Sequence, residues 1–195
     1  MKGSRFPFPV ANTGLLLFCA LAGPSPALAS GPVQDRAVEA GSMLADLQAL
    51  KAADVAPLSP DEAMDANRIG QRIRWAGAVY GISRSEQGTC LTILYARSGD
   101  DAEPRWAPDP TYQAFVACTA GGYAPLLVHE NTNVTIVGTI SGKRHIGMGG
   151  GGSEGPLVEI GRLYRWSDCI AGDVDPVCRQ GFLAPEPIAD APAAG

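Results

Sequence analysis

The sequence predicts a mainly β fold: a small five-stranded OB-like barrel with a helical N-terminal segment. Five runs rich in β-branched and aromatic residues follow one another between residues 72 and 166, separated by turn-forming residues, as in small all-β domains. Glycines inside these runs relieve crowding where strands bend sharply; they are Gly77, Gly81, Gly138 and Gly161. At 195 residues the chain is long enough for one domain with a core. An open antiparallel meander with one helix packed on it is the alternative.

Residues 1–29 have the features of a signal peptide. Lys2 and Arg5 give the segment a positively charged N-terminal region, and the apolar stretch that follows is too short to span a membrane. Ala27 and Ala29 are small residues in the A-x-A form that precedes a cleavage site. We therefore predict cleavage after Ala29, and a protein located in the periplasm or peripherally at the outer membrane.

Residues 30–70 are predicted to form a helical leader before the β domain. Apolar residues recur roughly along one face of the stretch 34–53, which is typical of an amphipathic helix. A second helix is expected after it, with Ser59 as the N-cap, Pro60 at the first helical position and Glu62 as the capping-box acid.

The β domain is expected to span residues 71–180. Its five predicted strands are 72–82, 89–96, 111–119, 133–143 and 156–166. A polar turn joins the first two strands, and a glycine-rich hairpin loop joins the last two. The Pro/Ala-rich segment 181–195 is expected to be disordered.

Four cysteines remain once the predicted signal peptide is removed, and an even number in an exported chain indicates disulfides. Cys169 and Cys178 bracket a loop that can close locally, while Cys90 and Cys118 lie in predicted strands, so we favour these two pairings among the three possible. A zinc site is disfavoured because no C-x-x-C pair occurs. Cys19 lies in the signal peptide after a bulky ring, which disfavours lipid attachment there.

The sequence provides no catalytic signature. It lacks the G-x-S-x-G elbow of serine hydrolases, and its glycine-rich stretch 143–156 has no G-K-[ST] element for phosphate binding. His129 and His145 are the only histidines and have no partners at ligand or catalytic spacing, so we expect both at the surface. The net charge of −5 argues against a nucleic-acid partner. We therefore expect no enzyme activity, no cofactor and no metal.

Aromatic residues are the best sequence candidates for ligand contact. A tryptophan or tyrosine at the mouth of a barrel can stack on a sugar or another small molecule. Trp106 lies in a predicted loop, Tyr112 near the start of the third predicted strand, and Tyr123 in the connection that follows this strand. We interpret these three residues as the candidate ligand-binding set.

Four runs of the predicted β domain occur in a recognisable order: "IRWAGAV" (73–79), "TCLTILYA" (89–96), "NVTIVGTISG" (133–142) and "GPLVEIGRLYRW" (155–166). In this order they resemble the Slp family, the starvation-inducible outer-membrane lipoproteins of Gram-negative bacteria. The resemblance implies an envelope protein and no catalytic residue. The family carries its lipid-modified cysteine at the mature N-terminus, where this chain has Ala29 and Ser30.

Two hypotheses about function follow. The first is a non-enzymatic, Slp-like envelope protein with a structural role, or a role in binding another envelope protein, linked to stress. The second is an OB-like periplasmic module that binds a small molecule or an oligosaccharide. A packed ring without a groove would favour the first hypothesis, and a groove with aromatic side chains would favour the second.

Overall fold

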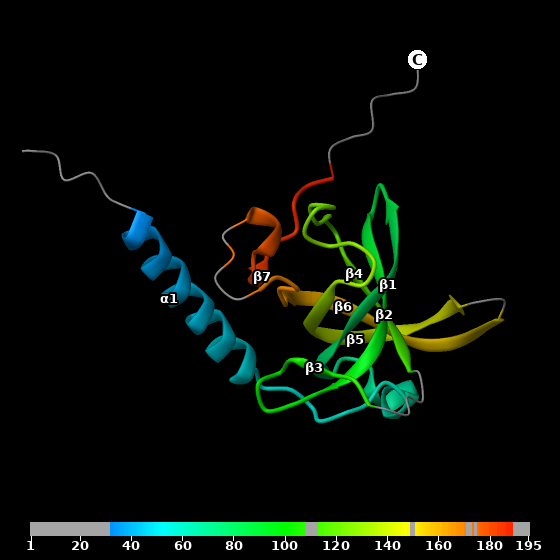
Figure 1. Ribbon diagram of the computed structural model, residues 1–195. Coiled ribbons are helices and arrows are strands. Elements are labelled where there is room, and N and C mark those ends of the chain that lie inside the picture. Colours follow the sequence, from blue (N-terminus) through cyan, green and yellow to red (C-terminus); the bar gives the residue numbers. More distant parts are fainter. Residues whose placement is uncertain (1–31, 108–112, 149–150, 171–172, 174, 189–195) are drawn as a thin grey trace, which may run out of the picture.

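The computed structural model describes residues 32–107, 113–148, 151–170, 173 and 175–188. The predicted signal peptide and Tyr112 lie outside these residues. Helix α1 (Pro32–Lys51) lies beside a β body (Figure 1). The strands are β1 (Arg72–Ser85), β2 (Gly88–Ser98), β3 (Pro104–Arg105), β4 (Ala114–Thr119), β5 (Asn133–Met148), β6 (Gly151–Arg165) and β7 (Gly181–Leu183). None of the described helices has both the length and the apolar character needed to cross a membrane.

Five of the strands pair into a closed ring in the order β1–β2–β4–β6–β5 and back to β1. Four of these pairings are antiparallel. The fifth joins β4 to β6 in parallel, with Val116 opposite Leu157 and Cys118 opposite Glu159. The prediction of a mainly β protein with five main strands and a helical N-terminal segment is confirmed; the short strands β3 and β7 were not predicted, and the open meander is wrong.

The interior of the ring explains the apolar residues at alternate positions of β1. Ile73, Trp75 and Val79 all belong to one buried cluster to which every strand of the ring contributes. The Trp75 ring meets Phe115 edge-on with centroids 5.0 Å apart, and its Nε1 donates a hydrogen bond to the carbonyl oxygen of Leu58 at 2.6 Å. The indole therefore packs in the core and also holds the segment that leads into the ring.

Two glycines allow strands of the ring to approach closely. A Cβ at Gly77 would lie 2.0 Å from the carbonyl oxygen of Leu94, and one at Gly138 would lie 2.4 Å from that of Glu159. The expected relief of crowding does not extend to Gly81, where a Cβ would have nothing within 4 Å. The register of β1 against β2 instead shifts between Val79 and Gly81, so this position marks an irregularity in the strand.

The glycine-rich segment between β5 and β6 differs from its prediction. We expected a loop from His145 onwards, but β5 continues to Met148 and β6 begins at Gly151, with Lys143 opposite Pro156. Glycine carries no side chain that could display the two-residue period of a strand, whereas the backbone ladder needs only N–H and C=O groups. The hairpin therefore extends well beyond the apolar part of its strands.

The first predicted helix of the leader forms, but the second does not form as an α-helix. The capping contacts do form, because the Ser59 amide and hydroxyl both donate to the Glu62 carboxylate, at 2.7 and 2.8 Å. Only two 3₁₀ turns follow, Glu62–Met64 and Ala66–Arg68, since Asp65 between them is extended, with φ −70° and ψ 134°. A good start signal thus precedes a segment that does not continue as an α-helix.

Helix α1 is attached to the body through its C-terminal half. Arg74 of β1 donates from Nη1 to the carbonyl oxygens of Leu50 and Lys51, at 3.1 and 3.0 Å, and so satisfies carbonyls that the helix leaves free at its end. Asp46 accepts a hydrogen bond from the backbone N–H of Phe182 at 3.0 Å. Residue 181 onwards was expected to be disordered; β7 instead pairs with β6 and reaches the helix.

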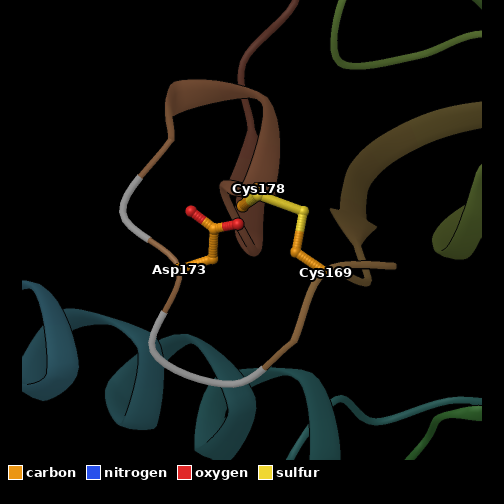
Figure 2. A group of neighbouring side chains, drawn as sticks. All are labelled: Cys169, Asp173 and Cys178. Carbon is orange, nitrogen blue, oxygen red and sulfur yellow. A yellow bond between two sulfur atoms is a disulfide. The ribbon is translucent and has the colours of Figure 1, made fainter.

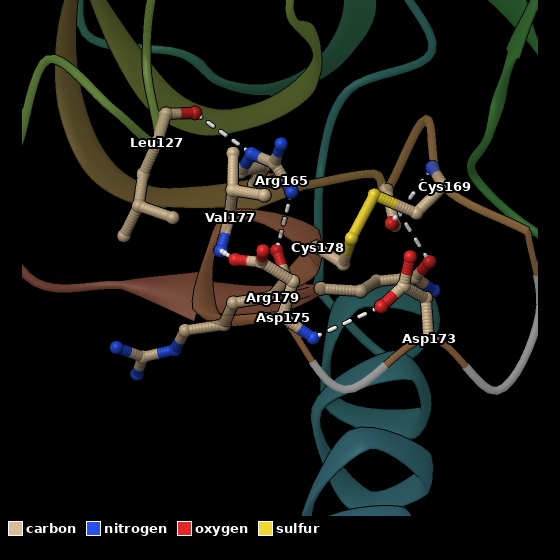
Figure 3. Close-up of a disulfide and its surroundings, with 10 residues drawn as sticks. Leu127, Arg165, Cys169, Asp173, Asp175, Val177, Cys178 and Arg179 are labelled. Atoms are coloured by element: carbon tan, nitrogen blue, oxygen red, sulfur yellow. Dashed lines mark hydrogen bonds between the residues drawn. A yellow bond between two sulfur atoms is a disulfide. The ribbon is translucent and has the colours of Figure 1, made fainter.

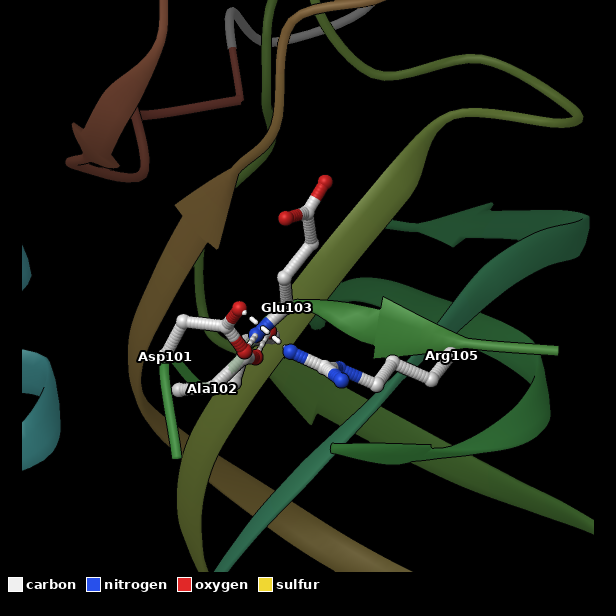
Figure 4. Close-up of polar contacts among 5 residues, drawn as sticks. Asp101, Ala102, Glu103 and Arg105 are labelled. Carbon is white, nitrogen blue, oxygen red and sulfur yellow. Dashed lines mark hydrogen bonds and ion pairs between the residues drawn. The ribbon is translucent and has the colours of Figure 1, made fainter. Parts of the chain in front are cut away.

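Polar contacts fix residues 101–105, which follow β2, against the ring (Figure 4). Arg105 pairs with Asp101 at 2.9 Å, and the Glu103 amide donates to the same carboxylate at 3.2 Å. Ala102, with φ 68°, is fully buried, and its carbonyl oxygen accepts from the Thr135 hydroxyl at 2.7 Å. Residues 101–105 are therefore held by specific contacts, although the sequence here is rich in turn residues.

Candidate functional site

The strongest candidate site is a groove of about 450 Å³ on the outside of the ring. All five ring strands contribute to it, and it contains the place where β4 pairs with β6. Its lining residues are Ser83, Ser85, Gln87, Gly88, Cys90, Cys118, Thr119, Ala120, Ser141, Arg144, Leu157, Val158 and Glu159. The groove thus exists because the ring closes.

The Cys90–Cys118 disulfide forms part of the groove wall and confirms the predicted pairing. The two cysteines are direct register partners on β2 and β4, with Cα atoms 4.1 Å apart. Both side chains are half-buried. The bond therefore links neighbouring strands of the ring and also presents sulfur atoms to a solvent-filled groove.

Arg144 is the cation of the groove. It comes from the long β5–β6 hairpin, is exposed, and donates from Nη1 to Sγ of Cys90 at 3.2 Å and to Sγ of Cys118 at 3.7 Å. Across the residues that the structure describes, the only ion pair joins Arg105 to Asp101, so Arg144 has no carboxylate partner. Its guanidinium retains donors for an anionic group of a ligand.

Hydroxyl and amide groups surround this cation. Ser83, Ser85 and Gln87 come from the end of β1 and its turn, and Thr119 from the end of β4. Ser141 donates from its hydroxyl to the carbonyl oxygen of Leu157 at 3.2 Å. The groove offers hydrogen bonds, one positive charge from Arg144 and one negative charge from Glu159, and its lining residues include no nucleophile paired with a base. Its chemistry is that of binding.

The groove was not predicted from the sequence, because several of its residues lie where loops were expected. Arg144 belongs to the stretch first interpreted as part of a flexible hairpin loop, and Ser83, Ser85 and Gln87 belong to a polar turn. The sequence did contain one signal for the groove: alternate residues along a strand lie on the same face of the sheet. It could be used only if β5 was known to continue past Lys143.

The predicted aromatic set does not line the groove. Trp106 is 48% exposed just after β3, while Tyr123 is 6% exposed and belongs to the core cluster. Tyr112 lies outside the described residues. Trp106 and Tyr123 therefore do not share a ligand-binding surface.

Tyr123 has a buried hydroxyl without a hydrogen-bond partner among the described residues. Burial raises the pKa of this phenol from its usual value near 10 to about 12. Because the folded-state pKa is the higher one, ionisation of this phenol favours the unfolded chain. The free energy of unfolding is therefore unaffected by this group below pH 10 and falls as the pH rises from 10 to 12.

We expect Tyr123→Phe to keep or raise the free energy of unfolding, by up to about 1 kcal/mol, since it removes an unsatisfied buried hydroxyl. Urea unfolding at pH 8 and at pH 11 measures this. The loss of stability between the two pH values should be smaller in the variant than in the parent. A variant that is less stable at pH 8 would show that the hydroxyl has a partner.

A second groove, of about 430 Å³, lies beside His129, with Arg84 and Glu130 also in its wall. The His129 ring is exposed, and its Nδ1 lies 2.8 Å from the carbonyl oxygen of Glu130. His145 is also exposed. Both histidines therefore lie at the surface, as expected, and the contact of His129 to a backbone carbonyl is not a catalytic pair.

Cys169, Asp173 and Cys178 form a cluster whose ligand-type atoms lie within 4.8 Å of one another (Figure 2). The two sulfur atoms are joined in a disulfide, which confirms the second predicted pairing. A disulfide has no thiolate to offer, and a structural zinc ion needs thiolate or imidazole ligands. The cluster is therefore a covalent crosslink beside a carboxylate.

Arg165 holds the residue that follows this crosslink, Arg179 (Figure 3). Arg165 is 2% exposed and donates from Nε to the carbonyl oxygen of Leu127 at 2.7 Å and from Nη1 to that of Arg179 at 2.5 Å. Burial lowers the pKa of its guanidinium. Its hydrogen bonds tie the C-terminal loop and the segment before β5 to β6.

A comparison with protein-family models matches residues 42–186 to the outer membrane lipoprotein Slp family. The matched segment runs from within α1 to just beyond β7, and it contains the whole ring, both disulfides and the groove. No curated protein and no solved structure matches the chain. Since the family model covers well over half of the sequence, the chain belongs to the outer membrane lipoprotein Slp family.

Proposed function

We propose that the protein is an exported, non-enzymatic component of the cell envelope that acts by binding an envelope partner, with a link to stress. Membership of the Slp family is the observation that carries this proposal. The chemistry of the groove agrees with it, because Arg144 and the hydroxyl groups around it are donors and acceptors for binding. The proposed location is the periplasm or the periplasmic face of the outer membrane.

Cell fractionation with intact-mass analysis tests this proposal. We expect a chain that begins at Ser30 in the periplasmic or outer-membrane fraction of a Gram-negative host, because Ala27 and Ala29 fit the specificity of signal peptidase. An unprocessed chain in the cytoplasm would contradict the envelope proposal. A diacylglyceryl-modified chain beginning at Cys19 would contradict cleavage after Ala29 and replace a peripheral location with a lipid anchor.

A second candidate function is favoured by the position of the groove. In OB-like proteins, ligands bind across the second and third strands and the loops beside them. The second and third strands of this ring are β2 and β4, and the groove lies over both, between the β1–β2 turn and the β5–β6 hairpin. The unpaired guanidinium of Arg144 and the surrounding hydroxyl groups suit an acidic oligosaccharide.

An NMR titration with an oligogalacturonate tests this candidate. We expect amide shifts at Ser85, Gln87 and Thr119, and about tenfold weaker binding by Arg144→Met, because one charge-assisted hydrogen bond contributes about 1.5–3 kcal/mol. Lys143→Met, a neighbouring exposed cation outside the groove lining, is the matched control. Equal losses in both variants would indicate attraction by overall charge, and no shifts would eliminate an acidic glycan as the ligand.

A further inference from the structure

The two disulfides of the protein have opposite electrostatic surroundings. At Cys90–Cys118, a guanidinium nitrogen of Arg144 lies 3.2 Å from one sulfur and 3.7 Å from the other. At Cys169–Cys178, a carboxylate oxygen of Asp173 lies within 4.8 Å of the sulfur atoms. A cation stabilises a thiolate, whereas an anion destabilises it. The first disulfide is therefore the easier of the two to open by thiol exchange.

Cys90–Cys118 can also be reached from the groove. Both sulfur-bearing residues of Cys90–Cys118 line the 450 Å³ groove. A thiolate must reach a sulfur of the disulfide to attack it, so exchange depends on access as well as on the stability of the leaving thiolate. The groove provides an approach to Cys90–Cys118 on the outside of the ring.

The ring keeps the two cysteines together after reduction. On either side of the Cys90–Cys118 pair, Thr89 is opposite Thr119 and Leu91 is opposite Ala117 in the β2–β4 ladder. Leu91 and Ala117 are fully buried in the core cluster. Neither the ladder nor the core packing depends on the S–S bond, so the two thiols would remain neighbours and could be oxidised again.

We propose that Cys90–Cys118 is a reversible thiol–disulfide exchange site that reacts with a dithiol protein, while Cys169–Cys178 remains oxidised. A thiolate of the dithiol protein attacks Sγ of Cys118, forming a mixed disulfide and displacing Sγ of Cys90 as a thiolate beside Arg144. The second thiol of the partner then displaces Sγ of Cys118. Two electrons and two protons pass from the partner, which leaves with its own disulfide.

The direction of attack follows from the charges around the two sulfur atoms. Arg144 is closer to Cys90, whereas Glu159, the other charged residue of the groove, is the register partner of Cys118 on β6. The thiolate is therefore more stable on Cys90, and the thiol with the more stable thiolate leaves faster. The placement of both charges is a property of the closed ring.

Partial reduction under native conditions tests the proposal. The folded two-disulfide protein is treated with dithiothreitol at pH 7, quenched with an alkylating reagent at successive times, and the labelled cysteines are identified by peptide mass. We expect Cys90 and Cys118 to be labelled about tenfold faster than Cys169 and Cys178, with the circular dichroism spectrum of the folded protein retained.

Two charge variants separate electrostatics from access. Arg144→Met should slow reduction of Cys90–Cys118 about threefold, whereas Lys143→Met should not, and Asp173→Asn should accelerate reduction of Cys169–Cys178 alone. Arg144, Lys143 and Asp173 are all exposed, so the variants should fold. Equal labelling of both disulfides, no effect of Arg144→Met, or loss of the folded spectrum when Cys90–Cys118 opens would each overturn the proposal.

Discussion

Replacing Trp75 by alanine is expected to lower the free energy of unfolding by about 3–5 kcal/mol, as for other large aromatic residues removed from a core. Trp75 is 1% exposed, packs against Phe115 and Tyr95, and donates a hydrogen bond to the Leu58 carbonyl oxygen. The substitution would leave a cavity inside the ring and a carbonyl without its donor. Urea unfolding followed by circular dichroism measures the loss.

Trp106→Ala is the matched control, because the same side chain is removed from a position that is 48% exposed. We expect a change of at most about 0.5 kcal/mol. Comparable losses in the two variants would contradict the placement of Trp75 inside the ring. A loss confined to Trp75→Ala would also show that Trp106 contributes little to the stability of the fold.

Replacing Gly77 by alanine is expected to cost about 3 kcal/mol, at the upper end of the usual range for overpacking. The added Cβ would lie 2.0 Å from the backbone carbonyl oxygen of Leu94 and 2.8 Å from a side-chain carbon of Ile93. A backbone atom cannot rotate away as a side chain can, so β1 and β2 must move apart. The expected result is a lower urea midpoint.

Gly81→Ala is the control in the same strand. A Cβ at Gly81 has nothing within 4 Å, so we expect a change of at most about 0.5 kcal/mol. If Gly77→Ala is as well tolerated as Gly81→Ala, then β1 does not approach β2 as closely as the structure shows.

The sequence predicted the ring strands well because their side chains carry a clear signal. Large apolar residues such as Ile73, Trp75 and Val79 recur at every second position or nearly so, and β-branched residues mark the other runs. The cysteine pairing was also predictable, since the loop between Cys169 and Cys178 can close locally and Cys90 and Cys118 lie in predicted strands. Local composition was sufficient for both conclusions.

The groove was not predictable in the same way, because it depends on long-range pairing. Cys118 and Glu159 become neighbours only when β4 pairs with β6 in parallel, and Arg144 reaches the disulfide only because the glycine-rich hairpin continues as strand. The pairing of β7 with β6 is another contact between distant segments, and the Pro/Ala-rich composition near it indicated disorder. Of the aromatic candidates, Tyr123 packs in the core and Trp106 is exposed, and neither lines the groove.

The core, the groove and the charges around Cys90–Cys118 all depend on closure of the ring through β4 and β6. Nuclear Overhauser contacts between the backbone protons of Val116–Cys118 and Leu157–Glu159 test it most directly. We predict a parallel pattern of contacts across these residues, together with slow exchange of their amide protons. The absence of these contacts, with fast amide exchange along β4, would show an open sheet and contradict the account.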